Sequence, residues 1–201
     1  MDLLRHLDDQ MLVAVNAFAR HTGWLQPIIV GYAKYGIVLF AALLVAGLIW
    51  ARSGPARTLA AAGWAVLATL LAVAVNQPVG HLFQERRPYA VHPHLLVLAD
   101  RTTDFSFPSD HAVMAGAVAA GLLILNRRLG LVAAVAALLM AFARVYIAAH
   151  YPWDVAGGLV LGAAVAVLGW LLLRVPLTAI VLRARDLPGI RVIFAQHGAR
   201  V

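Results

Sequence analysis

The chain has 201 residues, of which 63% are hydrophobic and 12% are charged, and its mean hydropathy is +0.84. This composition excludes an ordinary soluble domain and predicts a one-domain integral membrane protein. The net charge of +7 does not indicate a nucleic-acid binder, because most basic residues lie in short segments between apolar runs, and the lack of cysteine excludes disulfides, thiol nucleophiles and cysteine-ligated zinc.

The first 34 residues have the pattern of helices that lie on a membrane surface. Over residues 3–20, apolar and polar side chains occupy opposite helical faces, with Leu3, Leu4, Leu7, Met11, Val15 and Phe18 against Arg5, Asp8, Asp9 and Asn16. This pattern predicts an interfacial helix, which residues 21–23 interrupt. A second short helix over residues 24–34 is expected to lead into the first crossing. The alternative is one irregular transmembrane helix.

Five apolar runs follow, at residues 36–51, 58–75 with a continuation toward 83, 108–125, 129–149 and 152–173. About 20 helical residues cross a ~30 Å hydrocarbon core, so each run predicts one crossing. The predicted fold class is all-α, a polytopic membrane bundle of about five transmembrane helices in a single domain, 1–201. Residues 1–34 would form the interfacial segment, 36–173 the bundle and 174–201 a basic cytoplasmic tail.

Basic residues between the runs predict the orientation of the bundle. Cytoplasmic loops carry an excess of Lys and Arg, and such residues gather at 52–57, at 127–128 and after 173. These segments alternate along the chain with residues 84–106 and the turn at His150, which are therefore expected to face outside. An Ala- and Arg-rich composition with the single Lys34 is typical of a bacterial chain, and the predicted location is the bacterial inner membrane.

Ionisable residues beside long apolar runs are costly and indicate function, and one such group is Arg144, His150 and Asp154. Pro152 is expected to begin a helix with Asp154 in its first turn, from which the carboxylate can reach back to the imidazole. The guanidinium of Arg144 suits phosphate oxygens. The alternatives are a helix-start role for Asp154, a membrane-boundary position for His150 and snorkelling of Arg144 to the headgroups.

A second group lies at the start of the run at residues 108–125, where the sequence contains Ser109, Asp110 and His111. A helix N-terminus presents free backbone N–H groups to an anion. Ser109 would add a hydroxyl donor, and His111 on the first turn is placed to give a proton to a leaving group. Ser or Asp at this position is also a common helix cap, which is the alternative.

A third group, Arg86 and Arg87, begins the outer loop. Doubled Arg at a membrane boundary commonly sets topology, but these two fall on the side that the charge rule leaves poor in basic residues. We therefore predict Arg87 as a phosphate ligand, with Arg86 as its support or as a lipid-headgroup contact.

Together these groups resemble the three-part signature of the type-2 phosphatidic acid phosphatase superfamily, Lys-x6-Arg-Pro, Pro-Ser-Gly-His and Ser-Arg-x5-His-x3-Asp. The chain has Arg87-Pro88, Pro108-Ser109-Asp110-His111 and Ala143-Arg144-x5-His150-x3-Asp154, in the same order and spacing. The resemblance implies that His150 is the nucleophile, Asp154 its orienting partner and His111 the general acid. It also implies that Arg87, Arg144 and Ser109 bind phosphate.

The chain departs from the signature at three positions. Gly80 stands at the Lys position, which leaves His81 or Arg86 as a replacement, and Asp110 and Ala143 stand for the Gly and the Ser. The forms Phe-Pro-Ser-Asp-His-Ala and His-Tyr-Pro-Trp-Asp look like those of the bacitracin-resistance-type undecaprenyl pyrophosphate phosphatases of this superfamily. The missing Lys is expected to affect substrate affinity more than reaction type.

The resemblance implies a two-step hydrolysis of a lipid phosphate or diphosphate through a phosphohistidine, with polyprenyl diphosphate as the favoured substrate and phosphatidylglycerophosphate or phosphatidate as alternatives. No cofactor, metal or nucleic-acid partner is predicted, although Asp100, Asp104 and Asp110 near His92 and His94 could bind a cation. An anion transporter is the alternative of another class, and its expected polar residues along the crossings are absent apart from those at 76–78. The oligomeric state is not predicted.

Overall fold

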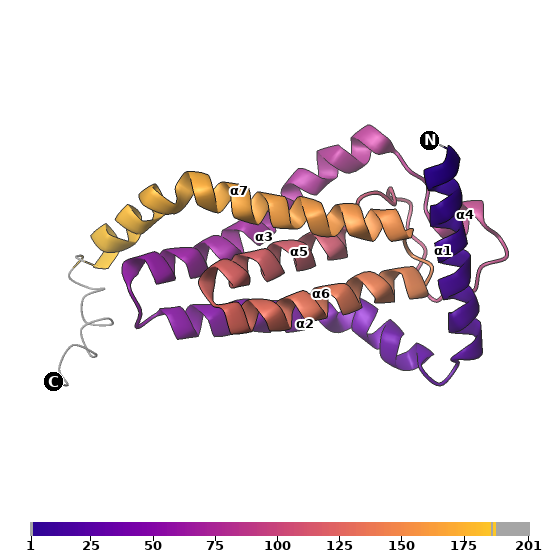
Figure 1. The fold of residues 1–201 in the computed structure, drawn as a ribbon, viewed down its shortest axis with the longest axis horizontal. Helices are drawn as coiled ribbons and strands as arrows, with labels where there is room; N and C mark the ends of the chain where they lie inside the picture. The colour runs from indigo at the N-terminus through magenta and orange to yellow at the C-terminus, as the bar shows by residue number, and fades with distance from the viewer. Residues whose placement is uncertain (1, 186, 188–201) are drawn as a thin grey trace.

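The computed structural model describes residues 2–185 and 187, and in this part of the chain all regular structure is helical. Five helices run lengthwise beside one another and a sixth crosses one end of them (Figure 1). The lengthwise helices are α2 (Gln26–Ala51), α3 (Ala56–Phe83), α5 (Asp110–Leu125), α6 (Arg127–Tyr146) and α7 (Pro152–Arg185). The crossing helix is α1 (Asp2–His21), and α4 (Pro88–Val91) is one turn in the loop beneath it. The predicted all-α bundle is confirmed.

Four of these helices, α2, α3, α6 and α7, are long and apolar enough to cross a membrane, and α5 is a shorter apolar helix of 16 residues. Large apolar side chains remain exposed on the outside of the bundle, including Leu138 on α6 and Leu172 on α7, as is expected where lipid is the solvent. The helix α5 lies at the centre, packed against α3, α6 and α7, and most of its residues are buried. A helix that is apolar on all sides belongs in such a position.

Two glycines allow α5 and α7 to approach closely. A Cβ atom at Gly116 would lie 2.3 Å from the Leu159 carbonyl oxygen, and one at Gly162 would lie 1.9 Å from the Val113 carbonyl oxygen. No side-chain rotation relieves a clash with backbone, so these positions exclude any residue with a Cβ unless the helices separate. This contact fixes the start of α7 against the start of α5.

Several helix boundaries differ from the predictions. The short helix expected at residues 24–34 is part of the continuous α2, which begins at Gln26 and passes through Lys34 into the crossing without a turn. The helix α6 ends at Tyr146, three residues before the predicted end at 149. The helix α7 continues beyond 173 to Arg185, so the segment predicted as a tail is helical as far as Arg185. The remainder of that segment, apart from residue 187, lies outside the described residues.

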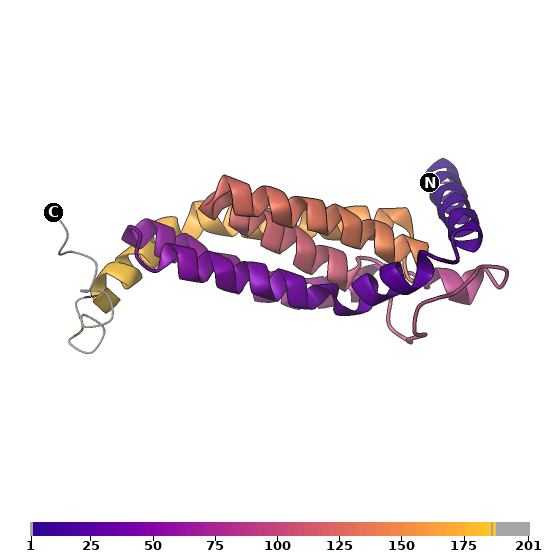
Figure 2. The same cartoon turned by 90° about the horizontal axis from the view of Figure 1, so that it is seen from below.

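The helix α1 is amphipathic as predicted, and its polar face contacts the protein. Asp8 and Asn16 are buried, whereas Leu4, Met11 and Phe18 are among the exposed apolar side chains. Figure 2 shows α1 at the end of the bundle opposite the last turns of α7, beside the loop that contains α4. The Asn16 amide donates to the Leu96 carbonyl oxygen at 2.8 Å and accepts from the Leu96 N–H at 3.0 Å. This helix therefore holds the long outer loop in place.

Charge is distributed unequally between the two ends of the bundle. Among the side chains that the structure describes, the end of the bundle where α7 finishes carries seven Arg and no Asp or Glu (Arg52, Arg57, Arg127, Arg128, Arg174, Arg183 and Arg185). The end that α1 crosses carries seven Lys or Arg and seven Asp or Glu, so its formal charge cancels.

Candidate functional site

The three groups of polar residues meet at the end of the bundle that α1 crosses. Arg87 directly precedes α4, Ser109 precedes α5 and His111 lies in its first turn. Arg144 is in the last turn of α6, and Asp154 is in the first turn of α7. His150 lies in the turn between those two helices and is 2% exposed, so its side chain faces the protein interior. His111 is within electrostatic range of Arg144, His150 and Arg87.

The two ring nitrogens of His150 have different partners. Nδ1 lies 2.8 Å from the Ser106 carbonyl oxygen, and Nε2 lies 3.1 Å from Nη1 of Arg87. A carbonyl oxygen only accepts and a guanidinium only donates. The imidazole therefore carries its proton on Nδ1, and the lone pair of Nε2 is directed toward Arg87.

Asp154 is fully buried, and its carboxylate interacts with His150 less directly than the sequence predicts. Its Oδ2 atom lies 3.5 Å from His150 Nδ1, while it accepts the Ser106 hydroxyl at 2.5 Å and the Tyr151 N–H at 2.8 Å. Asp154 therefore accepts hydrogen bonds at the start of α7 and lies at the outer limit of hydrogen-bond distance from the imidazole. The shorter hydrogen bond of Nδ1 goes to the Ser106 carbonyl oxygen.

Ser106 is the residue of this site that the sequence reasoning missed. It is fully buried and lies directly before Phe107-Pro108 in the second motif. Its N–H donates to the Glu85 carbonyl oxygen at 2.8 Å, which connects the motif to the end of α3. A hydroxyl residue beside a conspicuous motif in a polar loop gives no periodic signal, so only its proximity to Pro108 in the sequence could have drawn attention to it.

Arg87 is buried and held on both edges of its guanidinium. Nε and Nη2 form a bidentate pair with Asp104, at 3.1 and 2.8 Å, and Nη1 donates to the Ala149 carbonyl oxygen at 3.0 Å. Burial raises the pKa of Asp104, but hydrogen bonds from Arg87 and Thr102 outweigh it and the net pKa lies below 3.8. Asp104 is therefore ionised at neutral pH and fixes the guanidinium against His150.

Two buried donor groups of the predicted phosphate ligands have no hydrogen-bond partner among the described residues, the Oγ of Ser109 and the Nε of Arg144. Ser109 occupies the N-cap position of α5 but its side chain makes no capping hydrogen bond, which excludes the cap alternative. The buried Nε of Arg144 likewise contradicts snorkelling to the headgroups. Buried polar groups are normally paired, so unpaired donors mark a place where an anion can be bound.

The turn that carries His150 is strained and strongly constrained. Ala148 adopts a left-handed backbone with φ of 58°, which costs a non-glycine residue about 1 kcal/mol. The backbone around it is held by hydrogen bonds from Ala149 N–H to the Arg144 carbonyl oxygen and from Leu98 N–H to the Ile147 carbonyl oxygen. Strain of this kind persists only where the surroundings determine the conformation. Here the hydrogen bonds around Ala148 fix the backbone that precedes His150.

The environment of His150 favours its neutral form. Burial, together with the positive charges of Arg144 and Arg87, lowers the pKa of His150 well below 6.5. A neutral imidazole with its proton on Nδ1 offers an unprotonated Nε2 as a nucleophile. The same charges would stabilise an anion placed beside Nε2.

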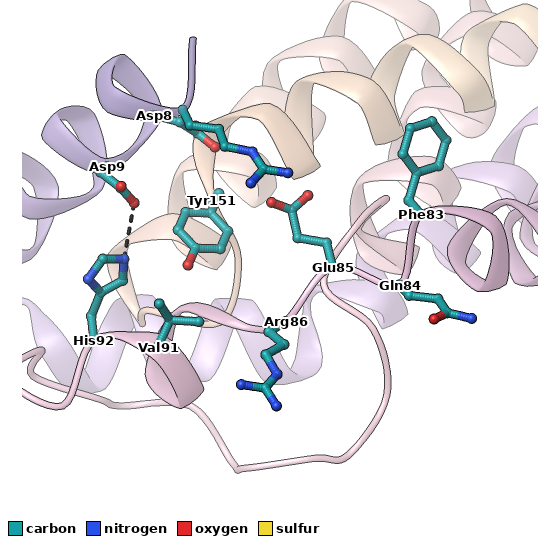
Figure 3. A pocket seen from close by; sticks show the side chains of 10 residues that line it. Asp8, Asp9, Phe83, Gln84, Glu85, Arg86, Val91, His92 and Tyr151 are labelled. Carbon is teal, nitrogen blue, oxygen red and sulfur yellow. Dashed lines mark hydrogen bonds and ion pairs between the residues drawn. The ribbon is translucent and has the colours of Figure 1, made fainter. Parts of the chain in front are cut away.

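Arg86 does not join this site. Its side chain lines a separate pocket of about 400 Å³, together with acidic residues of α1, Glu85 and Tyr151 (Figure 3). In that view the hydrogen bond between Asp9 and His92 closes one side of the pocket. The neighbouring Arg87 lies against His150 instead, with Nη1 3.1 Å from Nε2.

Gly80 lines a pocket of about 330 Å³ on the α3 side, which also contains His81, Asp104 and Asp110. Among the residues that line it there is no Lys or Arg, and His81 is one of the two predicted replacements for the motif Lys. Asp110 accepts hydrogen bonds from Asn76 and Gln77 of α3.

The cation cluster considered from the sequence is not assembled in the described part of the chain. No group of three or more His, Asp or Glu side chains there is arranged to hold a metal ion. The residues concerned have separate partners, since Asp100 pairs with Lys34, Asp104 with Arg87 and His92 with Asp9.

Comparison with known proteins identifies the family of the chain. Residues 61–176 match the PAP2 superfamily. The chain is 30% identical over 166 residues to the undecaprenyl-diphosphatase BcrC of Bacillus subtilis, with 82% of each chain covered. It is 36% identical over 126 residues to the decaprenylphosphoryl-5-phosphoribose phosphatase of Mycobacterium tuberculosis, covering 61% of this chain and 66% of that one.

A crystal structure of a transmembrane PAP2-type phosphatidylglycerolphosphate phosphatase from Bacillus subtilis has the same fold. The TM-score is 0.60 at 20% sequence identity, and the similarity covers 84% of this chain and 85% of that one. The resemblance drawn from the sequence motifs is confirmed. The chain belongs to the PAP2 superfamily and is a multi-pass membrane lipid phosphatase.

Proposed function

We propose that this protein removes the terminal phosphate of a polyprenyl diphosphate, with undecaprenyl diphosphate as the substrate, at the outer face of a bacterial inner membrane. The observation that carries the proposal is the arrangement around His150, whose unprotonated Nε2 lies beside Arg87 and within range of the charge of Arg144. The unpaired donors of Ser109 and Arg144 are available for phosphate oxygens. The relatives named undecaprenyl-diphosphatase support the choice of substrate.

The reaction that fits these groups has two steps. The lone pair of His150 Nε2 attacks the terminal phosphorus, the bond from phosphorus to the bridging oxygen breaks, and His111 gives its proton to that oxygen. Water then attacks the phosphohistidine, His111 takes the proton from the water, and the phosphorus–nitrogen bond breaks to release inorganic phosphate. Phosphoryl transfer depends mainly on positioning and on stabilising the equatorial oxygens. Arg87, Arg144 and the first turn of α5 would supply that charge, so no step is assigned to a metal.

The proposed orientation follows from the charge of the two ends. At the end where α7 finishes, the short segments that connect or follow the apolar runs carry Arg and no Asp or Glu among the described side chains; such basic connections are typical of the cytoplasmic side, and the site lies at the other end. The headgroup would meet the site from outside while the lipid tail remains among the apolar helices.

The chain offers a direct test of orientation because it contains no cysteine. Thr103→Cys and Ser53→Cys each place one thiol at an exposed loop position, at the site end and at the opposite end respectively. In intact cells a membrane-impermeant maleimide should label the first variant, and the second only after lysis. The reverse pattern would contradict the outer-face proposal.

The test of activity is phosphate release by the purified protein from polyprenyl diphosphate, phosphatidylglycerophosphate and phosphatidate, each with and without EDTA. We expect the highest kcat/KM on polyprenyl diphosphate, no effect of EDTA and no activity in His150→Ala. A preference for either phospholipid would replace the substrate assignment. Loss of activity in EDTA that a divalent ion restores would contradict the metal-free mechanism.

A further inference from the structure

The acceptor of the His150 Nδ1 proton is a backbone atom. The Ser106 carbonyl oxygen lies 2.8 Å from Nδ1, whereas the Asp154 carboxylate lies 3.5 Å away, at the limit of a hydrogen bond. A carbonyl oxygen retains its acceptor character whatever the protonation state of nearby side chains. The tautomer of His150 therefore has a support that does not depend on the charge of Asp154.

The position of this carbonyl depends in turn on the Ser106 side chain. The Ser106 hydroxyl donates to Asp154 Oδ2 at 2.5 Å, and its distance of 3.5 Å from Nδ1 makes it a poor partner for the imidazole itself. Asp154 belongs to α7, while Ser106 belongs to the loop before α5. The hydroxyl thus ties the loop to the helix that begins after His150, and so sets the distance from the carbonyl oxygen to the imidazole.

The Asp154 carboxylate makes no short hydrogen bond to the imidazole. Its Oδ2 atom already accepts two short hydrogen bonds, from Ser106 and from the Tyr151 N–H, and its Oδ1 atom has no partner among the described residues. A second connection between the same segments, from the Ser109 N–H to the Asp154 carbonyl oxygen at 3.1 Å, holds the helix starts together.

We propose that Ser106 is a positioning residue for the phosphatase reaction: its backbone carbonyl fixes the tautomer and aim of His150, and Asp154 acts through the Ser106 hydroxyl. This inference rests on the proposed function in one respect, namely that His150 Nε2 is the attacking atom. In a direct Asp–His pair the Ser106 hydroxyl would not be needed. Here the side chains of Ser106 and Asp154 form one hydrogen bond, so loss of either side chain breaks the same bond.

The kinetic test compares Ser106→Ala, Asp154→Asn and the double variant on polyprenyl diphosphate. A buried hydrogen bond to a charged group is worth enough to change a rate by about 10- to 100-fold. We expect each single variant to lose that much kcat with little change in KM, and the double variant to lose no more than the worse single variant. Multiplying losses, or wild-type kcat in Ser106→Ala, would overturn the proposal. Thr69→Ala removes a buried hydroxyl that bonds only its own helix and should leave kcat unchanged.

The second test reads the tautomer directly and needs no turnover. Protein labelled with ¹⁵N in its histidine rings is compared with His150→Gln to assign the His150 resonances by NMR. We expect the proton on Nδ1 in the wild type and, because the acceptor is the carbonyl, also in Asp154→Asn. A proton on Nε2 in either protein would overturn the proposal. If the wild type releases no phosphate from any lipid tested, the proposed function fails, and this measurement still decides the role of Ser106.

Discussion

The close contact of α5 and α7 at Gly162 makes Gly162→Ala an informative structural perturbation. The added Cβ would lie 1.9 Å from the Val113 carbonyl oxygen and 2.7 Å from the Ala117 nitrogen. Real Cβ atoms essentially never approach another heavy atom closer than 3.0 Å, so α5 and α7 must separate by roughly 1.1 Å at this level. Overpacking of this size costs about 1–3 kcal/mol.

Separation of α5 and α7 would displace site residues, because both helices carry them. Gly162 lies about 12 Å along α7 from Asp154, at 1.5 Å per residue, and α5 carries His111. A misplacement of reacting groups by about 1 Å can cost on the order of 100-fold in rate. We therefore expect Gly162→Ala to lose about 100-fold in kcat and to unfold at a lower temperature than the wild type.

The matched control is Gly63→Ala on α3, where an added Cβ meets no atom within 4 Å. Alanine has the higher helix propensity, so this variant should unfold at no lower temperature than the wild type. Both proteins would be purified in the same detergent and compared by thermal unfolding and phosphate release. If Gly162→Ala keeps wild-type stability and kcat, the reasoning from close helix contact is refuted.

Three further predictions concern the loop, the phosphate site and its pH dependence. Asn16→Ala removes both hydrogen bonds to Leu96 and should speed hydrogen exchange in the outer loop and lower activity several-fold, about 1 kcal/mol per bond; unchanged exchange would show that α1 does not hold the loop. Gly80→Lys fits sterically, with its Cβ 3.4 Å from the Phe107 carbonyl oxygen, and should lower KM by adding a cation to the pocket, whereas a raised KM would contradict this. Because the pKa of folded His150 lies well below 6.5, the acid limb of kcat/KM should fall below pH 6.5, and a midpoint at or above 6.5 would count against a neutral His150 as the nucleophile. The unfolded chain binds this proton first as pH falls, so His150 contributes stability above pH 6.5 that is lost on acidification.

Much of the fold could be predicted because membrane helices are specified by local composition. The five apolar runs and the amphipathic α1 correspond to helices in the structure. Helix ends were less predictable. The predicted ends were placed at polar residues, whereas α2 continues through the first boundary and α7 continues past Arg174. The sequence also could not show that the polar face of α1 binds the outer loop, because that contact joins Asn16 to Leu96, 80 residues away.

The part of the candidate site that consists of motif residues was predictable from the sequence. The charge rule and the motif spacing together placed Arg87, Ser109, Arg144, His150 and Asp154 at one end of the bundle, and the structure brings them there. The sequence could not show that Arg86 lines a different pocket from Arg87, beside Glu85 and the acidic residues of α1. Ser106 was missed because its role comes from a backbone carbonyl, which every residue possesses, and only the folded geometry shows which one meets the imidazole.

The central claim is that His150 carries the phosphoryl group between the lipid and water. The most direct measurement is to mix the protein with polyprenyl diphosphate labelled with ³²P in its terminal phosphate, quench within the first turnover, and analyse the protein for acid-labile, alkali-stable label. We predict label on a peptide that contains His150 in the wild type and no label in His150→Ala. In His111→Ala, which lacks the proton donor and base, the label should form or decay more slowly than in the wild type, but on the same residue. Turnover by the wild type without any protein-bound label, or label that persists in His150→Ala, would contradict the account.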